Sequence, residues 1–268
     1  MPKPPSLDSL LTPEKIAPDA FRLDVPNGWE QGRGAFGGLL LGTIIRAVES
    51  FVDDRARAVR SVTAQLMGPV APGRSVIRLE ELRRGNAVST LRAVLEQAGD
   101  ALVHAVVVAG QPRPVGLAWK RRAPPPMTPW REVPVLDMMP GLAPVFTQHF
   151  EYRSTGAPPF FGADEPAVGG WIRPRIDAER LDDAYVVALA DAWWPAGTAV
   201  MDGVHPFGTI AFTLDIVGKL GPADRGAPLF HKGVALESVD GYMSDDRELW
   251  TPDGRLVAVN HQTMVIIK

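Results

Sequence analysis

The sequence predicts an α+β protein made of two similar halves, each with a helix followed by an antiparallel meander of strands. Three observations lead to this fold class. Each half carries an apolar helical pattern before several strand-like runs that turn residues separate. A proline-dense stretch lies near the middle of the 268-residue chain. Finally, segment 62–70 aligns without gaps on segment 212–220, which indicates duplication of a whole small domain.

The first half is predicted to begin with a short strand at 21–25 and a helix over 36–51. The helix has apolar residues at helical spacing and ends at Asp53 and Asp54. Turn signals follow at Pro72–Gly73, Gly85–Asn86 and Gly99–Asp100. They separate strands that we expect at 61–70, 75–82, 87–97 and 101–109.

The second half repeats this order. Strands are predicted at 145–153 and 171–175, a helix at 182–194, and further strands at 212–220, 232–240, 242–250 and 256–267. Thr63 falls opposite Thr213 in the alignment of the halves, although two unrelated meanders can also resemble each other by chance. We therefore expect one domain over 1–112, a proline-rich linker over 113–144, and a second domain over 145–268.

Composition excludes several classes of protein. Hydrophobic residues make up 46% and charged residues 22%, as in ordinary globular chains. The formal net charge of −3 gives no dense basic face for a nucleic acid. The chain has no cysteine, and Met1–Pro5 lacks the apolar region of a secretory signal. No apolar run reaches membrane-spanning length, so we expect a cytoplasmic protein without a membrane span.

Familiar catalytic motifs are missing. The sequence contains no G-x-S-x-G, H-E-x-x-H or P-loop pattern. Its five histidines lie far apart and show no metal-ligand spacing, so we expect neither a metal site nor a cofactor. His104 and His261 lie in apolar strands, which favours hydrogen-bonded core residues over catalytic ones.

Three polar residues in apolar surroundings suggest a site. Asp191 lies between Leu189–Ala190 and Ala192–Trp194, so burial would raise the pKa of its carboxyl unless donors face it. Thr213 and Gln262 lie in strands that otherwise look apolar. Each residue alone can simply face solvent. Together they can hold a water molecule, with a carboxylate to accept its proton and a hydroxyl and an amide to orient it.

These motifs resemble those of the acyl-CoA thioesterase II family. The similar segments are Phe36–Gly42, Gly68–Gly73, Glu81–Asn86, Trp171–Arg173, Ala190–Asp191 with Pro195, Thr213–Asp215 and Val257–Gln262. Each motif is weak by itself, but their order and spacing agree over most of the chain outside the linker. The resemblance implies a double hotdog fold, in which curled antiparallel sheets wrap around helices, and hydrolysis of fatty acyl-CoA.

The resemblance also implies that Asp191, Thr213 and Gln262 activate the attacking water. The first half retains Thr63 but has Leu41 and Val107 near the positions of the acid and the amide, so one half would carry the chemistry. Segment 216–220 departs from the aromatic and histidine-rich run usual in the family, which leaves the acyl group open.

Other features stay open. Backbone N–H groups near Gly37 and Gly38 are candidates for the oxyanion site, although these glycines can equally serve to pack the helix. A double hotdog that binds acyl-CoA or lipid without turnover is the main alternative function. A hotdog hydratase fits less well, because no suitable Asp–His pair is present. Exposed edge strands lead us to expect a homodimer or a dimer of dimers.

Overall fold

The computed structural model describes residues 5–138, 141 and 143–267. Positions 1–4 of the expected first domain, 139, 140 and 142 of the linker, and 268 lie outside these residues. The first half contains α1 Leu7–Leu10, β1 Glu14–Ala17, β2 Ala20–Val25, β3 Glu30–Gln31, β4 Gly34–Ala35, α2 Gly37–Val52, β5 Ala58–Leu66, β6 Gly73–Arg84, β7 Val88–Gln97 and β8 Asp100–Gly110. The second contains β9 Phe150–Ser154, β10 Ala167–Pro174, α3 Asp183–Asp191, β11 Phe207–Ile216, β12 Leu229–Val239, β13 Tyr242–Trp250 and β14 Leu256–Ile266, with 3-10 turns η1 Val145–His149, η2 Ala196–Ala199 and η3 Pro222–Asp224.

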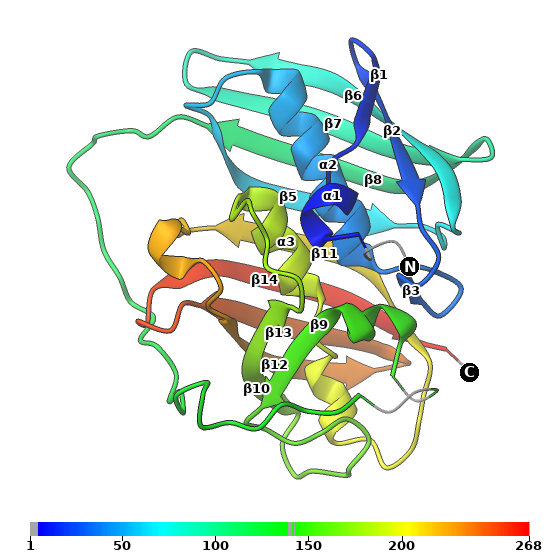
Figure 1. The fold of residues 1–268 in the computed structure, drawn as a ribbon, viewed down its shortest axis with the longest axis vertical. Coiled ribbons are helices and arrows are strands. Elements are labelled where there is room, and N and C mark those ends of the chain that lie inside the picture. The colour runs from blue at the N-terminus through cyan, green and yellow to red at the C-terminus, as the bar shows by residue number, and fades with distance from the viewer. Residues whose placement is uncertain (1–4, 139–140, 142, 268) are drawn as a thin grey trace.

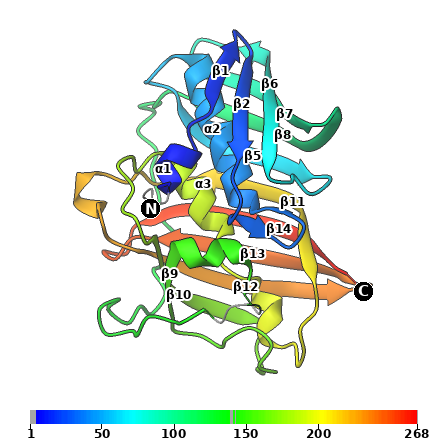
Figure 2. The ribbon, with the colours of Figure 1, turned by 45° about the vertical axis from the view of Figure 1, so that its right-hand side comes forward.

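One twelve-stranded antiparallel sheet runs through both halves of the described chain. Its strand order is β1-β2-β6-β7-β8-β5-β11-β14-β13-β12-β10-β9. From either edge inward, the strands of one half follow the same succession along the chain, and each half ends at the centre with its own strand, β5 or β11 (Figures 1 and 2). Thr63 lies directly opposite Thr213 across this pair, so the two residues that align in sequence also meet at the centre of the sheet.

The helices α2 and α3 lie side by side against the concave face of the sheet (Figure 2). Glycines allow their close approach, because a Cβ at Gly38 would lie 2.6 Å from the carbonyl oxygen of Ala188 and one at Gly42 would lie 3.0 Å from that of Ala184. The contacts run in opposite directions along the two helices. The helices are therefore antiparallel, and the N-terminal end of α2 lies beside the C-terminal end of α3.

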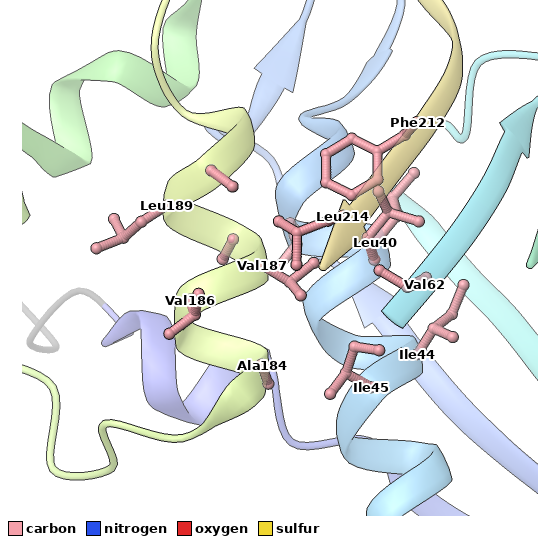
Figure 3. Close-up of a cluster of buried hydrophobic side chains, with 14 of the residues drawn as sticks. Leu40, Ile44, Ile45, Val62, Ala184, Val186, Val187, Leu189, Phe212 and Leu214 are labelled. Carbon is pink, nitrogen blue, oxygen red and sulfur yellow. The ribbon is translucent and has the colours of Figure 1, made fainter. Parts of the chain in front are cut away.

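The core fills the space between the helix pair and the sheet. Figure 3 shows side chains of α2 and α3 packed with those of β5 and β11, and its labelled members are almost fully buried: Leu40, Ile44, Ile45, Val62, Ala184, Val186, Val187, Leu189, Phe212 and Leu214. Each large apolar side chain buried in this way contributes on the order of 2 kcal/mol to folding. The alternation of Phe212 and Leu214 with exposed residues fixes which face of β11 points inward.

The linker has two parts with different surroundings. Its second part packs on the outer face of the C-terminal half, where Val133, Trp171, Phe230 and Trp250 form a separate apolar cluster. The indole N–H of Trp171 also donates to the carbonyl of Thr128 at 2.8 Å. Residues 112–124, by contrast, are exposed throughout. In the described chain no helix is long and apolar enough to cross a membrane.

Some predicted boundaries were wrong. Residues 145–149 form a 3-10 turn rather than the start of a strand, because the Thr147 hydroxyl and N–H both donate to the Pro144 carbonyl. Helix α3 ends at Asp191 rather than at 194, and its last carbonyls accept from Tyr152 and Arg247 instead. Strand β11 begins at Phe207, five residues before the predicted start.

Candidate active site

Asp191 lies where the C-terminal end of α3 meets the N-terminal end of α2. Gln262, on β14, donates from Nε2 to Oδ1 of Asp191 at 3.0 Å. The backbone N–H of Gly38 at the start of α2 also donates to this carboxylate. The structure therefore brings together two of the three residues that the sequence predicted to share a water molecule, and it places them at the end of a helix.

Gln262 is fully buried and held by three hydrogen bonds. Besides Asp191, its Nε2 donates to Oδ1 of Asn260 at 2.9 Å, and its Oε1 accepts from the Thr209 hydroxyl at 2.8 Å. Both amide hydrogens are thus engaged by acceptors, which fixes the orientation of the side chain. One lone pair of Oε1 remains for a further donor.

The prediction that Thr213 joins Asp191 and Gln262 is wrong. Thr213 pairs with His261, whereas Gln262 pairs with Phe212, so Thr213 and Gln262 point to opposite faces of the sheet. Thr213 is exposed on the outer face. The link from Thr213 to the site is through its backbone carbonyl and not its hydroxyl. That carbonyl accepts a hydrogen bond from the side chain of Asn260.

Thr209 supplies the hydroxyl instead. A bulge between Thr209 and Ala211 inserts one extra residue in β11, and such an insertion switches the face to which the following side chains point. Thr209 consequently faces inward, opposite the buried Met264. The outward position of Thr213 was predictable, because apolar residues at 212, 214 and 216 put it on the outward side of an alternating strand. No residue pattern in the sequence indicates the bulge itself.

Opposing influences act on the pKa of the Asp191 carboxyl. Burial raises the pKa of its carboxyl, whereas the positive charge of Arg247 and the donors on Gln262 and Gly38 lower it. Arg247 is itself buried and forms a 3.1 Å ion pair with Asp245. Its Nη1 lies 3.3 Å from the Ala190 carbonyl oxygen, so this guanidinium binds the turn of α3 that carries Asp191.

Gly37 and Gly38 have distinct positions. Gly38 uses its N–H for Asp191 and its lack of a side chain to pack against α3. A Cβ at Gly37 would lie 2.7 Å from Oδ2 of Asp191, so only glycine leaves room beside this oxygen. The first N–H groups of a helix have no partner within the helix, which makes the N–H of Gly37 the available donor at this end of α2.

The histidines lie apart from this site. His261 is exposed and pairs with Asp246 at 2.6 Å, so its interpretation as a core residue is wrong. His104 is partly exposed on β8. His231 is fully buried and stacks on Trp193, and burial holds its pKa well below the usual value. Among the described residues, no group of three or more His, Cys, Asp or Glu is placed to hold a metal ion.

Two cavities lie elsewhere. The larger, about 560 Å³, lies beside Glu49 at the opposite end of the helix pair. The smaller, about 500 Å³, lies over β5, β7 and β8 next to Lys219. Neither is lined by Asp191, Thr209 or Gln262.

Comparison with protein families gives matches in both halves. Residues 25–110 match the family model described as acyl-CoA thioesterase N-terminal domain. Residues 121–266 match the one described as acyl-CoA thioesterase C-terminal domain. The second match includes Asp191, Thr209 and Gln262. No curated protein matches the chain in sequence.

Solved structures show the same fold. A hot dog fold protein of unknown function from Alicyclobacillus acidocaldarius is 21% identical with a TM-score of 0.89, covering 98% of both chains. The acyl-CoA thioesterase II TesB2 of Mycobacterium marinum is 16% identical with a TM-score of 0.78, again over 98% of both chains. The tesB protein of Mycobacterium avium subsp. paratuberculosis is 17% identical with a TM-score of 0.79 and the same coverage. The chain thus has the hot dog fold.

Proposed function

Because the chain belongs to the acyl-CoA thioesterase family, we propose that it hydrolyses a fatty acyl-CoA to the free acid and CoA, with Asp191 as the general base. The observation that carries this proposal is the hydrogen-bonded pair of Asp191 and Gln262 at the N-terminal end of α2. A carboxylate with a fixed amide beside it suits water activation without a covalent intermediate.

In this mechanism one water hydrogen points to the carboxylate of Asp191 and the other to Oε1 of Gln262. Thr209 donates to the same Oε1 and keeps it in place. The water oxygen adds to the thioester carbonyl carbon as its proton passes to Asp191. The carbon–sulfur bond then breaks, and the leaving thiolate of CoA takes the proton back from Asp191. The reaction conserves atoms and electrons without a redox partner or a metal ion.

The tetrahedral intermediate carries a negative oxygen that requires donors. We propose that the N–H of Gly37 is one of them. It lies at the positive end of the α2 dipole and next to the carboxylate, and backbone donors of this kind stabilise developing oxyanions. The N–H of Gly38 is excluded from this role, because it already binds Asp191.

We propose further that the two halves are tandem hotdog repeats with one catalytic end. The palindromic strand order supports the repeat. At the other end of the helix pair, the side chain of Asp182 accepts from the N–H of Tyr185 and so occupies the start of α3. We retain the expectation that copies of the chain associate as homodimers or dimers of dimers, through the outermost strands β1 and β9.

The test is release of free thiol from acyl-CoAs of graded chain length. Turnover that saturates with one range of lengths supports the proposal and defines the acyl group. Tight saturable binding without thiol release at any length would instead identify a binding protein that retains the fold and lacks the reaction.

A further inference from the structure

The linker carries an unusual surface, which we call the basic linker segment and define as residues 112–121. Both of its ends are fixed. The backbone N–H of Gln111 donates to the Ala87 carbonyl at 2.8 Å, and Arg122 forms an ion pair with Glu248. Between these anchors every residue is exposed. Figure 1 shows this part of the chain running outside the body of the molecule on the left.

Three large apolar side chains project from the segment at alternate positions. Val115 is 63% exposed, Leu117 75% and Trp119 80%. The later part of the same linker buries its apolar residues, since Met127 and Trp130 pack against the cluster around Trp171. Exposed apolar residues gathered in this way are uncommon on a protein surface and mark a site of interaction.

The charge of the segment is one-sided. Between Asp100 and Glu132 the sequence has no acidic residue. The basic linker segment itself contains Arg113, Lys120 and Arg121, and none of the three forms an ion pair within the described ranges 5–138, 141 and 143–267. A chain with a net charge of −3 thus concentrates three free cations beside three exposed apolar side chains.

We propose that the basic linker segment docks the protein on an anionic lipid surface. Tryptophan and leucine insert at the boundary between headgroups and acyl chains, where an amphipathic indole is favoured. The neighbouring cations meet the lipid phosphates, each adding to the attraction. Pro112 and Arg113 line the smaller cavity at one end of the segment. The three apolar side chains lie outside that lining and project from an extended chain, which suits insertion into lipid better than capture of a folded partner.

Sedimentation with vesicles tests the proposal. The whole protein is mixed with vesicles of phosphatidylcholine alone, or of phosphatidylcholine with phosphatidylglycerol. We expect binding to the anionic vesicles only, weakening as salt is raised. Replacing Lys120 and Arg121 together by serine should weaken it at least about tenfold. The double variant Leu117→Ser with Trp119→Ala should weaken vesicle binding by a similar factor. It should also weaken the vesicle binding that remains at high salt.

Matched controls separate the segment from general charge and hydrophobicity. Arg74→Ser with Arg83→Ser removes two exposed cations elsewhere, and Phe161→Ala removes an apolar side chain that is 77% exposed. Both should bind like the wild type, and all variants should show the wild-type thermal unfolding. Equal binding to neutral vesicles, no binding to anionic ones, or unchanged binding by the segment variants would overturn the proposal. So would self-association without lipid that Trp119→Ala abolishes, since the segment would then be a protein contact.

Discussion

The side-chain amide of Gln262 donates to Asp191 Oδ1 at 3.0 Å and to Asn260 Oδ1 at 2.9 Å. The two acceptors use both amide hydrogens, and the carbonyl oxygen of Gln262 accepts from the Thr209 hydroxyl. One lone pair of that oxygen and the carboxylate of Asp191 remain as acceptors. A water molecule between them would be held by two acceptors, with its lone pairs free for attack.

Thr209 and Thr213 offer a matched pair of substitutions on one strand. Thr209→Val removes the donor to Gln262 and should lower kcat/KM about fivefold, since such a hydrogen bond contributes about 1 kcal/mol. Thr213→Val should change kcat/KM little, because that side chain faces outward. Steady-state thiol release measures both. A larger loss for Thr213→Val than for Thr209→Val would show that the inward face of β11 is assigned wrongly.

Arg247 should set the acid limb of the pH profile. Its positive charge lowers the pKa of the Asp191 carboxyl, and the mechanism needs that carboxyl ionised. Loss of the charge should move the acid limb of kcat/KM to higher pH. Arg247→Met alone leaves Asp245 buried without its ion pair, which costs about 3–5 kcal/mol of stability. The measurement therefore uses Arg247→Met with Asp245→Asn.

Arg247→Lys is the control, because it keeps the positive charge and should keep the acid limb close to its wild-type position. An unchanged acid limb in the double variant would remove Arg247 from the electrostatics of the site.

Gly37 should tolerate no side chain. A Cβ there would lie 2.7 Å from Oδ2 of Asp191, so Gly37→Ala should displace the carboxylate and reduce kcat/KM by about a hundredfold. Gly203→Ala is the control, because a Cβ at that position meets nothing within 4 Å. Full activity in Gly37→Ala would mean that the carboxylate needs no fixed place beside α2.

Glu49 should make stability depend on pH. Burial and the nearby Asp182 and Asp183 raise its pKa to about 7 from a usual value of 4.5, against the opposing charges of Arg180 and Arg46. In the unfolded chain Glu49 ionises at lower pH than in the fold. The protonated Glu49 therefore contributes to the free energy of unfolding, and this contribution is complete below the unfolded pKa of 4.5. It is lost as the pH rises through the folded pKa of about 7.

Glu49→Gln should consequently stabilise the protein by on the order of 2 kcal/mol at about pH 8 and by much less at about pH 5. Denaturant unfolding at both pH values measures the difference. The exposed Glu165 provides the control, since Glu165→Gln should have no pH-dependent effect. An equal gain for Glu49→Gln at both pH values would contradict the assigned pKa.

The sequence predicted the elements whose patterns are local. Helix 36–51 and strand 242–250 agree with α2 Gly37–Val52 and β13 Tyr242–Trp250 within one residue at each end. Thr63 and Thr213, which align as equivalent positions of the two halves, also pair at the centre of the sheet, and the sequence did not predict that pairing. Boundaries failed where contacts distant in sequence decide them, as at the end of α3, where Arg247 binds the last turn.

The candidate site was predictable in part for the same reason. Asp191 and Gln262 are polar residues among apolar neighbours, which the sequence displays directly. Thr209 could not be found in this way, because the bulge that turns it inward depends on pairing with β14. Arg247 and Asp245 form a buried ion pair on β13. The sequence pattern of that strand does not single these two residues out.

Comparison of Asp191→Asn with the wild type tests the central claim most directly. Asparagine keeps the shape of the side chain but cannot take a proton from water, so kcat should fall by about 10²–10⁴-fold with thermal unfolding little changed. Binding of the CoA product should persist, because the substitution leaves the rest of the site in place. A folded Asp191→Asn variant that releases thiol at the wild-type rate would contradict the account.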